Sequence, residues 1–389
     1  MKICILTPRF PFPENGGDVL RINNIARYLK SEGHSLILVS YCEQHNNTDE
    51  ALCLYDKVYV VKRQNLTSFY HSATFLMQGK PIQCGYYFSD GFEELFRKVV
   101  QNEKPELYIS HLLRMAPYLE RNGLQKLSII EMTDALSRTY AMSSNAKGGI
   151  LKRIIYRLEK DFIKRYEKHV VKFFPKVVLV SQADIEYINT EMSYGKYDSL
   201  KLYTNGVDCS ARPQKPYDAH KICFIGNMRT LQNQDAVLHF ANDIFPLILK
   251  KIPDARFYVV GAEPPRQIMA LADRDNIIVT GFVEDLEKAV SDSCVAVAPV
   301  RVAAGIQNKV LVAMANGLPV IMTSLISKAI PETQHGENCY ICDDSEAFAN
   351  SCINLMQDED LRQKISGGGY ELVCKGYSWA EKLKGYERL

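Results

Sequence analysis

The sequence lacks an apolar run of the length that crosses a membrane. Although 47% of its 389 residues are hydrophobic, no run approaches the roughly 18 apolar residues of a spanning helix, so no transmembrane segment is expected. The first eight residues carry one cation and only a short apolar run before a proline. We therefore expect them to form a strand and not a signal peptide.

An excess of charge of one sign and a repeated cysteine motif are absent as well. The 47 Lys and Arg residues are nearly balanced by 45 Asp and Glu residues. This balance of charge gives no general attraction to nucleic acid, so no nucleic-acid partner is expected. The 11 cysteines are scattered, and several lie in apolar runs, so we expect reduced thiols in a cytoplasmic protein. Cys339 and Cys342 form a lone CxxC in a stretch that reads as extended. Extended backbone would point the two side chains to opposite faces, which disfavours a metal or redox site.

The chain is longer than one hydrophobic core usually supports, so two domains are expected. Strand-like apolar runs alternate with helical patterns, which predicts an α/β fold with parallel sheets and right-handed crossovers. Residues 220–226 (HKICFIG) restart the pattern that opens the chain (MKICIL). We therefore place a first domain at residues 1–215 and a second at 216–376, with a tail at 377–389 that is long enough to cross back onto the first.

The stretch 299–323 reads as strand, glycine loop, helix, stop and strand. Residues 303–305 (AAG) form the loop, apolar residues at helical spacing follow, and Gly317 and Pro319 end the helix. A glycine loop before a helix presents free N–H groups and the positive end of the helix dipole, which suits a phosphate. Lys309 falls in the first turn, where a cation opposes the dipole. It either meets that anion or is a solvated lysine on an ordinary helix.

The first domain opens with a comparable unit. Gly16 and Gly17 end a proline-rich loop, and Asp18 is expected to cap a helix at 19–32. Ligands of open α/β sheets bind at such places. The motif is not GxGxxG and no acidic residue closes the second strand, so a nicotinamide dinucleotide site is disfavoured. The two glycines either let the backbone approach a ligand between the domains or form a tight turn only.

Polar side chains also follow two later strands of this domain. His111 and Arg114 follow a strand at 106–110, and Asp134 follows one at 128–131. The carboxyl ends of parallel strands are where such sheets place their sites. His111 is either a site residue or a structural histidine.

A long helix is predicted at 150–174, with an apolar stripe and many basic residues. The basic residues either form a solvated outer face or face anionic lipid. A lipid-linked substrate would favour the second interpretation.

Short motifs recur in order along nearly the whole chain. They are Pro11-x-Pro13 with Gly16, Gly17 and Arg21, Gly33-His34, Val180-Ser181, residues 205–208 (NGVD), Phe224-x-Gly226 with Asn233, Val279-x-Gly281, Pro299 with residues 305–309 (GIQNK), and residues 313–320 (AMANGLPV). On these motifs the chain resembles GT-B glycosyltransferases of the retaining family 4 type. The Gln-Asn-Lys variety is similar to a branch associated with surface or exported polysaccharide assembly.

The resemblance implies two Rossmann-like domains that face a cleft, with a nucleotide-sugar donor on the second and a saccharide or lipid-linked acceptor on the first. It implies no cofactor and no metal, because N–H groups and cations take the charge of the leaving diphosphate. It also implies roles by position. Donor binding would use Gly16, Gly17, Gly226, Asn227, Arg229, Gly305, Ile306, Gln307, Asn308 and Lys309, catalysis His111 and Asp134, and the acceptor side Arg9, Arg21 and Arg114. The expected place is the cytoplasm, with peripheral membrane contact through the basic helix at 150–174.

The chain departs from the family pattern at two positions. Ala304 and Val312 replace two glutamates, and the second glutamate normally accepts hydrogen bonds from the nucleotide ribose. A hydrogen bond to a charged group contributes about 1.5–3 kcal/mol. The sequence is therefore compatible with an active transferase, or with a degenerate one that acts as a binding or scaffold subunit.

Overall fold

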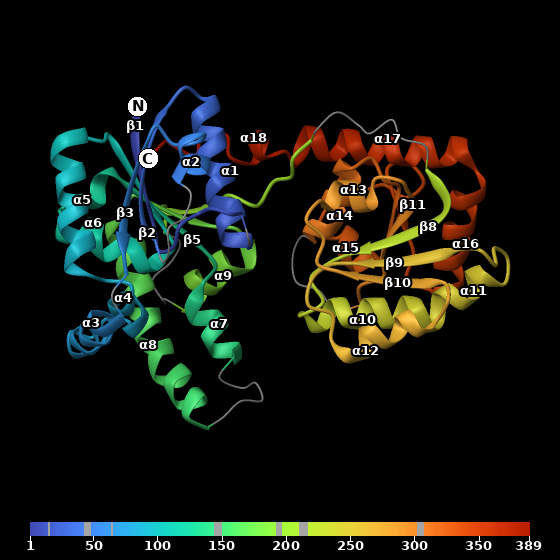
Figure 1. The fold of residues 1–389 in the computed structure, drawn as a ribbon, viewed down its shortest axis with the longest axis horizontal. Helices are drawn as coiled ribbons and strands as arrows, with labels where there is room; N and C mark the ends of the chain where they lie inside the picture. Colours follow the sequence, from blue (N-terminus) through green and yellow to red (C-terminus); the bar gives the residue numbers. More distant parts are fainter. Residues whose placement is uncertain are drawn as a thin grey trace. The chain divides into compact units, whose positions relative to one another are not determined.

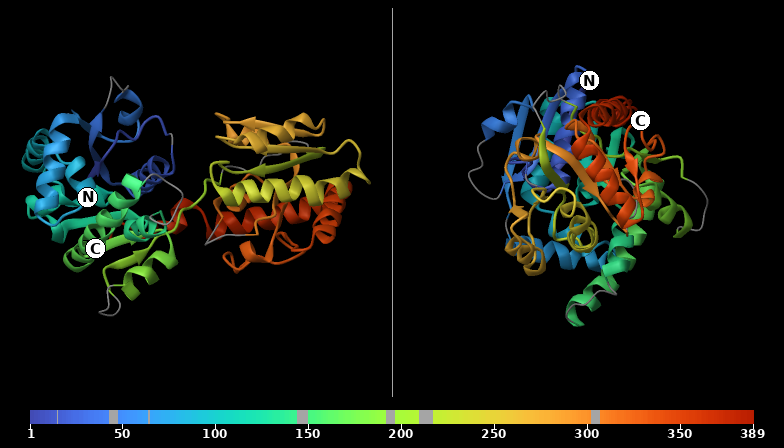
Figure 2. Two further views of the ribbon diagram at one scale, coloured as in Figure 1. Left: turned by 90° about the horizontal axis from the view of Figure 1, so that it is seen from below. Right: turned by 90° about the vertical axis from the view of Figure 1, so that its right-hand side faces the viewer.

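The computed structural model describes residues 1–14, 16–42, 48–63, 65–143, 150–191, 197–209, 217–301 and 307–389. They form two compact units (Figure 1). Unit 1 comprises Met1–Thr204 together with Leu383–Leu389, and unit 2 comprises Asn205–Lys382. Each unit is built on its own sheet, and the views in Figure 2 show helices on both faces of each sheet.

Unit 1 contains a parallel sheet that has seven strands within the described residues, in the order β3-β2-β1-β4-β5-β6-β7. The strands are β1 Lys2–Thr7, β2 Ser35–Cys42, β3 Lys57–Lys62, β4 Leu107–His111, β5 Ser128–Thr133, β6 Lys176–Leu179 and β7 Leu200–Leu202. β1, an interior strand between β2 and β4, is buried on both faces after its first residue, as its continuous apolar run predicts.

The helices of unit 1 connect these strands. They are α1 Gly17–Ser31, α2 Thr48–Leu52, α3 Asn65–Met77, α4 Ile82–Tyr86, α5 Asp90–Glu103, α6 Ala116–Arg121, α7 Leu136–Ser143, α8 Ile150–Phe173 and α9 Gln182–Glu191, with short 3₁₀ turns at Leu113–Met115 and Gln125–Leu127.

Unit 2 contains a second parallel sheet, six-stranded within the described residues, in the order β10-β9-β8-β11-β12-β13. The strands are β8 Asp218–Ile225, β9 Arg256–Val260, β10 Ile277–Gly281, β11 Ser293–Ala298, β12 Val320–Met322 and β13 Tyr340–Ile341. The predicted α/β class with parallel strands is confirmed in both units.

The helices of unit 2 cover the sheet on two sides. They are α10 Leu231–His239, α11 Phe245–Leu249, α12 Arg266–Met269, α13 Leu286–Val290, α14 Asn308–Ala315, α15 Ser324–Ser327, α16 Ser345–Gln357, α17 Glu359–Gly376 and α18 Trp379–Lys382, with a π-helical segment at Phe240–Ile244 and a 3₁₀ turn at Ala270–Asp273. In Figure 1, α10 and α12 lie on one side of the strands and α14 and α17 on the other.

The chain divides between Thr204 and Asn205, and not near residue 215 as expected. The reason is local packing in unit 2. A side chain at Gly206 would lie 2.5 Å from the backbone nitrogen of Trp379, and the Val207 N–H donates to the Tyr377 carbonyl at 2.9 Å. The segment that leaves unit 1 is thus held against the end of α17 as soon as it enters unit 2. For the same reason the tail returns to unit 1 from Leu383, and not from residue 377.

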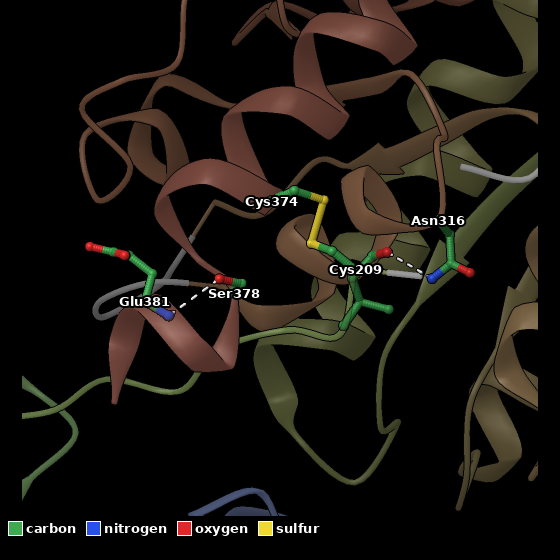
Figure 3. The surroundings of a disulfide bond; sticks show 6 residues. Cys209, Asn316, Cys374, Ser378 and Glu381 are labelled. Atoms are coloured by element: carbon green, nitrogen blue, oxygen red, sulfur yellow. Dashed lines mark hydrogen bonds between the residues drawn. A yellow bond between two sulfur atoms is a disulfide. The ribbon is translucent and has the colours of Figure 1, made fainter. Parts of the chain in front are cut away.

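Two cysteines correct the expectation that all thiols are reduced. Cys209 and Cys374 form a disulfide within unit 2 (Figure 3). Their Cα atoms are 5.6 Å apart, which suits a bridge. The other nine cysteines are not part of this disulfide. The pairing could not be predicted, because the two residues are separated by 165 positions in the sequence.

Within the described ranges, the structure contains no helix that combines the length and the apolar character needed to cross a bilayer.

Candidate functional site

The carboxyl ends of the unit 2 strands bring two glycine loops into direct contact. Gly226 follows β8 and Gly261 follows β9. A Cβ atom added to Gly261 would lie 1.8 Å from the Gly226 carbonyl oxygen, and the φ angle of Gly261 is +153°. Only glycine fits this approach. Gly226 is itself closely packed, because a Cβ atom there would lie 2.7 Å from the Asn233 side chain.

Lys309 is directed into this edge of the sheet. Its Nζ donates a hydrogen bond to Asn233 Oδ1 and lies 5.0 Å from the centre of the Phe224 ring. Burial lowers the pKa of Lys309 to about 8. A small pocket adjoins the lysine, lined mainly by apolar residues of β11 and α14. Lys309 is therefore not the solvated lysine of an ordinary helix.

The start of α14 keeps its backbone donors free of a side-chain cap. Gln307 occupies the N-cap position, its side chain makes no capping hydrogen bond, and the residue is buried. Asn308 is the first helical residue and is exposed. Gly305 and Ile306, predicted to hold the diphosphate, lie outside the described residues. The helix predicted after them begins and ends as expected, with Gly317 in a left-handed conformation at its end.

Arg229, the predicted second cation, is exposed and already paired. Its Nε lies 3.0 Å from a carboxylate oxygen of Glu263, a residue in the loop after β9 with a φ angle of +56°. The Arg229 backbone N–H donates to the Asn227 side chain at 2.8 Å, and the Asn227 carbonyl accepts from Asn233 at 2.7 Å. A ligand anion would compete with Glu263 for Arg229.

In unit 1, His111 ends β4 and is 1% exposed. Neither ring nitrogen has a hydrogen-bond partner within the described residues. Burial lowers the pKa of His111 to about 3, against the opposing attraction of Asp18, and the nearby arginines lower it further. The imidazole is neutral at physiological pH, and a buried polar ring without partners is an exception in folded proteins.

Gly16 and Asp18 stand beside Arg9 at the start of α1. Gly16 has a φ angle of +116°, and a Cβ atom there would lie 2.8 Å from the Arg9 guanidinium. Asp18 was expected to cap the helix. Instead Gly16 is the N-cap and α1 begins at Gly17, while the Asp18 carboxylate accepts two hydrogen bonds from Arg9. Burial raises the pKa of Asp18, but the hydrogen bond and charge of Arg9 outweigh it and hold the pKa below its usual value.

Arg21, a predicted acceptor-side arginine, lies in the interior of unit 1. It is 1% exposed and forms two 3.0 Å hydrogen bonds with the Glu131 carboxylate. A third bond goes to the Tyr203 carbonyl at 2.8 Å. A buried, fully engaged guanidinium packs the interior of unit 1, so we assign Arg21 to structure and not to acceptor contact.

Arg114 and Asp134 lie after the ends of β4 and β5. Arg114 is half-buried, donates to the Gln83 side chain at 3.0 Å and stacks on Tyr87, 5.0 Å from the ring centre. Asp134 has an exposed surface, yet neighbouring atoms still desolvate its carboxyl and raise its pKa. His111 and Asp134 thus lie at the same edge of the sheet. Burial is the main cause of both pKa shifts, since it lowers the pKa of His111 and raises that of Asp134.

The CxxC cysteines have separate surroundings. The Cys339 thiol faces the Gln334 carbonyl at 3.8 Å, and the Cys342 sulfur lies 3.3 Å from the Ser351 hydroxyl. Among the residues that the structure describes, no group of three or more His, Cys, Asp or Glu side chains could hold a metal ion.

Comparison with known proteins agrees with this geometry. Residues 219–358 match the family model described as glycosyl transferases group 1. This part of unit 2 is therefore similar to group 1 glycosyl transferases. The match includes the glycine loops after β8 and β9, Lys309 and the whole of α14.

The full chain is similar to solved structures of the same two-unit architecture. It superposes on a TarM variant from S. aureus with a TM-score of 0.65 and 11% identity, covering 99% of this chain and 98% of that one. For HepE of Anabaena in complex with UDP the TM-score is 0.64 with 16% identity, again covering 99% and 98%. For sucrose-phosphate synthase of Thermosynechococcus elongatus the TM-score is 0.63 with 14% identity, covering 99% and 97%. The predicted GT-B fold is confirmed.

One curated protein is similar over almost the whole sequence. It is an uncharacterized 44.6 kDa protein in the cps region of Klebsiella pneumoniae, 23% identical over 97% of this chain and 96% of its own length.

Sequence reasoning missed three features near the predicted site residues of the two units. Asn233 was noted only as part of a motif, yet it holds both Lys309 and the loop after β8. For Glu263 the sequence indicates only a position after a predicted strand, and not its ion pair with Arg229. Asp18 was read as a cap, although the proximity of Arg9 in sequence could have suggested an ion pair.

Proposed function

We propose that this protein transfers a sugar from a nucleoside diphosphate donor to a saccharide or lipid-linked saccharide, with retention of configuration and without a metal, in polysaccharide assembly. The observation that carries the proposal is the uncapped start of α14 with Lys309 turned into the same sheet edge, inside a group 1 glycosyltransferase domain. Backbone N–H groups and a lysine at a helix start suit a leaving diphosphate.

The proposed reaction needs no protein nucleophile. The bond from the anomeric carbon to the diphosphate oxygen breaks, and a bond to an acceptor hydroxyl oxygen forms on the same face of the sugar. The hydroxyl proton passes to the departing phosphate oxygen. Lys309, the α14 N–H groups and Arg229 would stabilise the charge on the diphosphate.

His111 would contact the donor sugar in this scheme. Its buried, unpartnered ring supports the assignment, because a sugar hydroxyl would supply the missing hydrogen bond. A neutral imidazole can donate from one nitrogen and accept at the other. Asp134 remains our second catalytic candidate at the same edge, and Arg9 and Arg114 remain the acceptor-side candidates.

The choice of donor and setting follows the comparisons. HepE is crystallised with UDP and with UDP-glucose, and the TarM variant with UDP and a GlcNAc-glycerol. These names support a UDP-sugar as the first donor to test here. The curated relative lies in a cps region, which supports polysaccharide assembly. We also propose a cytoplasmic location with peripheral membrane contact through α8, whose side chains up to residue 158 lie outside the described residues.

The decisive test replaces Lys309 with Ala and measures UDP binding by calorimetry together with turnover of UDP-sugars. Loss of a charged hydrogen bond should weaken UDP binding roughly ten- to hundredfold. Lys251→Ala is the matched control, because Lys251 is exposed in the connection that enters β9 at the opposite edge of the sheet. Equal UDP affinity in the wild type and Lys309→Ala would contradict the proposal.

A second candidate function is a degenerate transferase that acts as a scaffold. Val312 favours it, since this side chain packs against the hydrophobic core of unit 2 and cannot accept a hydrogen bond from a ribose. Calorimetry with UDP and GDP separates the two. No heat of binding at millimolar nucleotide would favour the scaffold.

A further inference from the structure

Helix α3 presents an apolar face to solvent. Among its described side chains, from Thr67 to Met77, all the exposed ones are apolar and recur at helical spacing. They are Phe69, Tyr70, Ala73, Leu76 and Met77. Phe69 is 69% exposed, Tyr70 67% and Met77 88%. Single exposed apolar residues are ordinary, whereas a continuous stripe marks an interaction surface.

The opposite face of α3 is buried and carries three polar side chains beside Phe75, which packs against Phe88. Ser68, His71 and Ser72 face the interior, and the Ser72 hydroxyl donates to the Ser68 carbonyl at 2.8 Å. A Cβ atom at Gly85 of α4 would lie 2.5 Å from the His71 carbonyl oxygen. Because α3 and α4 approach this closely, a larger residue at position 85 would open the contact.

The chain segment that carries the apolar face has cations and no acidic residue. No Asp or Glu occurs between Asp56 and Asp90, and Asp90 itself lies 3.5 Å from the His71 ring on the buried face of α3. Lys80, which follows α3, forms a 3.1 Å ion pair with Glu120. Before α3, Arg63 stacks on Tyr86, 4.8 Å from the ring centre, and Lys62 is exposed.

We propose that α3 docks on an anionic phospholipid bilayer. Phe69, Tyr70 and Met77 enter the boundary between headgroups and acyl chains, and Lys62 and Arg63 meet the lipid phosphates. An apolar helix face flanked by basic residues is the usual arrangement of an interfacial helix, and each cation near an anionic surface adds to the attraction.

A second copy of the chain is the other occupant that an apolar face could have. A two-fold contact through α3 would place the same patch of each copy against the other. Lys62 and Arg63 would then face their own counterparts with no acidic residue of the segment 57–89 to compensate. Like charges across an interface oppose association, so the charge pattern favours lipid.

The position of α3 connects this surface with the transfer site. The helix follows β3, and all strands of the unit 1 sheet are parallel. It therefore begins at the sheet edge where β4 ends with His111. Docking through α3 would bring that edge near a membrane-embedded acceptor. This link rests on the proposed function, whereas docking itself does not.

The test measures co-sedimentation of the full chain with vesicles of phosphatidylcholine, with and without phosphatidylglycerol. The variants are Phe69→Glu, Met77→Glu and the matched control Phe282→Glu, since Phe282 in unit 2 is also 69% exposed. Circular dichroism checks the fold of each variant, and light scattering follows its oligomeric state. No nucleotide or acceptor is needed, so docking and transfer can fail separately.

We expect the wild type to bind the anionic vesicles more tightly than the neutral ones, and binding to weaken with salt. Phe69→Glu and Met77→Glu should each lower the partition coefficient roughly tenfold or more, by removing one inserted side chain, and Phe282→Glu should leave it unchanged. Absence of wild-type binding, or an equal loss in all three variants, would overturn the proposal. So would a dimer that Phe69→Glu dissociates without any vesicle binding.

Discussion

At the scale of single residues, His111 combines deep burial with unsatisfied nitrogens. A structural histidine of the core usually has at least one hydrogen-bond partner, and this one has none within the described residues. The same burial that lowers its pKa to about 3 also makes the folded state sensitive to acid, because only the unfolded chain takes up the proton easily. Stability and ligand binding at this position can therefore be measured separately.

We predict that His111→Gln reduces the dependence of stability on pH. In the wild type the unfolded state protonates His111 near pH 6.5 and the folded state only near pH 3. Stability from this residue is thus complete above pH 6.5 and is lost as the pH falls toward 3, by up to about 1.4 kcal/mol per pH unit. Urea unfolding at several pH values in this window measures the difference between the two proteins.

The same variant addresses the role of His111 in transfer. If the ring binds the donor sugar, His111→Gln should lower turnover at pH 7. At this pH, proton uptake by His111 no longer affects the stability of the fold. Identical pH profiles of stability would show that the ring is not buried as described.

At the scale of elements, the carboxyl-terminal segment is fastened to unit 1 by a buried lysine. Lys176, at the start of β6, donates to the carbonyls of Gly385, Tyr386 and Arg388 at 3.2, 2.8 and 2.9 Å. The Tyr386 hydroxyl donates to Glu131 at 3.0 Å, the same carboxylate that holds Arg21. The segment therefore completes the interior of unit 1 and is not a loose end.

We predict that Lys176→Met releases this segment. The substitution leaves three carbonyl groups without their donor, which should cost unit 1 about 1–3 kcal/mol. Hydrogen exchange at residues 383–389 should become fast, and urea unfolding should shift to lower concentration. Lys201→Met is the control, because Lys201 is exposed on the neighbouring strand β7. Protected amides at 383–389 in Lys176→Met would refute the fastening role.

At the scale of the whole molecule, the two segments that connect the units are joined to each other inside unit 2. The Val207 N–H donates to the Tyr377 carbonyl at 2.9 Å, and the Trp379 N–H donates to the Val207 carbonyl at 3.3 Å. The disulfide joins Cys209 of the first segment to Cys374 in the last turn of α17, with Asn316 at the end of α14 nearby (Figure 3). Both connections between the units thus start from one cross-linked region of unit 2.

We predict that Cys209→Ser destabilises unit 2 under oxidising conditions by roughly 2–5 kcal/mol, because a cross-link restricts the unfolded chain most when it closes a long loop. Unfolding can be followed by the fluorescence of Trp379, the only tryptophan. In reductant the wild type and the variant should unfold alike. Cys53→Ser, at an exposed free cysteine, should match the wild type under both conditions. A difference that persists in reductant would contradict the cross-link as its cause.

Helix α14, where we propose donor binding, shows how much local patterns can predict. The apolar spacing after residue 308 and the glycine at 317 predicted α14 almost to the residue, because helix periodicity and C-capping are local properties. The partners of Lys309 were not predictable in the same way. Asn233 and Phe224 come from another strand and helix, and only the fold brings them to the lysine.

The exposed apolar face of helix α3 is the clearest feature that was not predicted from the sequence. The structure turns Phe69, Tyr70 and Met77 outward, whereas it buries Phe75 together with two serines and a histidine. The close contact with Gly85 decides this orientation, and such a contact cannot be read from the spacing of α3 itself. Arg21 is a similar case, since only the position of Glu131 on β5 shows that this arginine belongs to the interior.

The sequence by itself determined the alternation of strands and helices, the two sheets and the glycine loops before their helices, because these depend on neighbours along the chain. Tertiary structure alone decided which polar groups meet, which cysteines pair and which face of α3 remains outside. Those outcomes depend on contacts between residues far apart in sequence, where a shift of one helix face changes every partner.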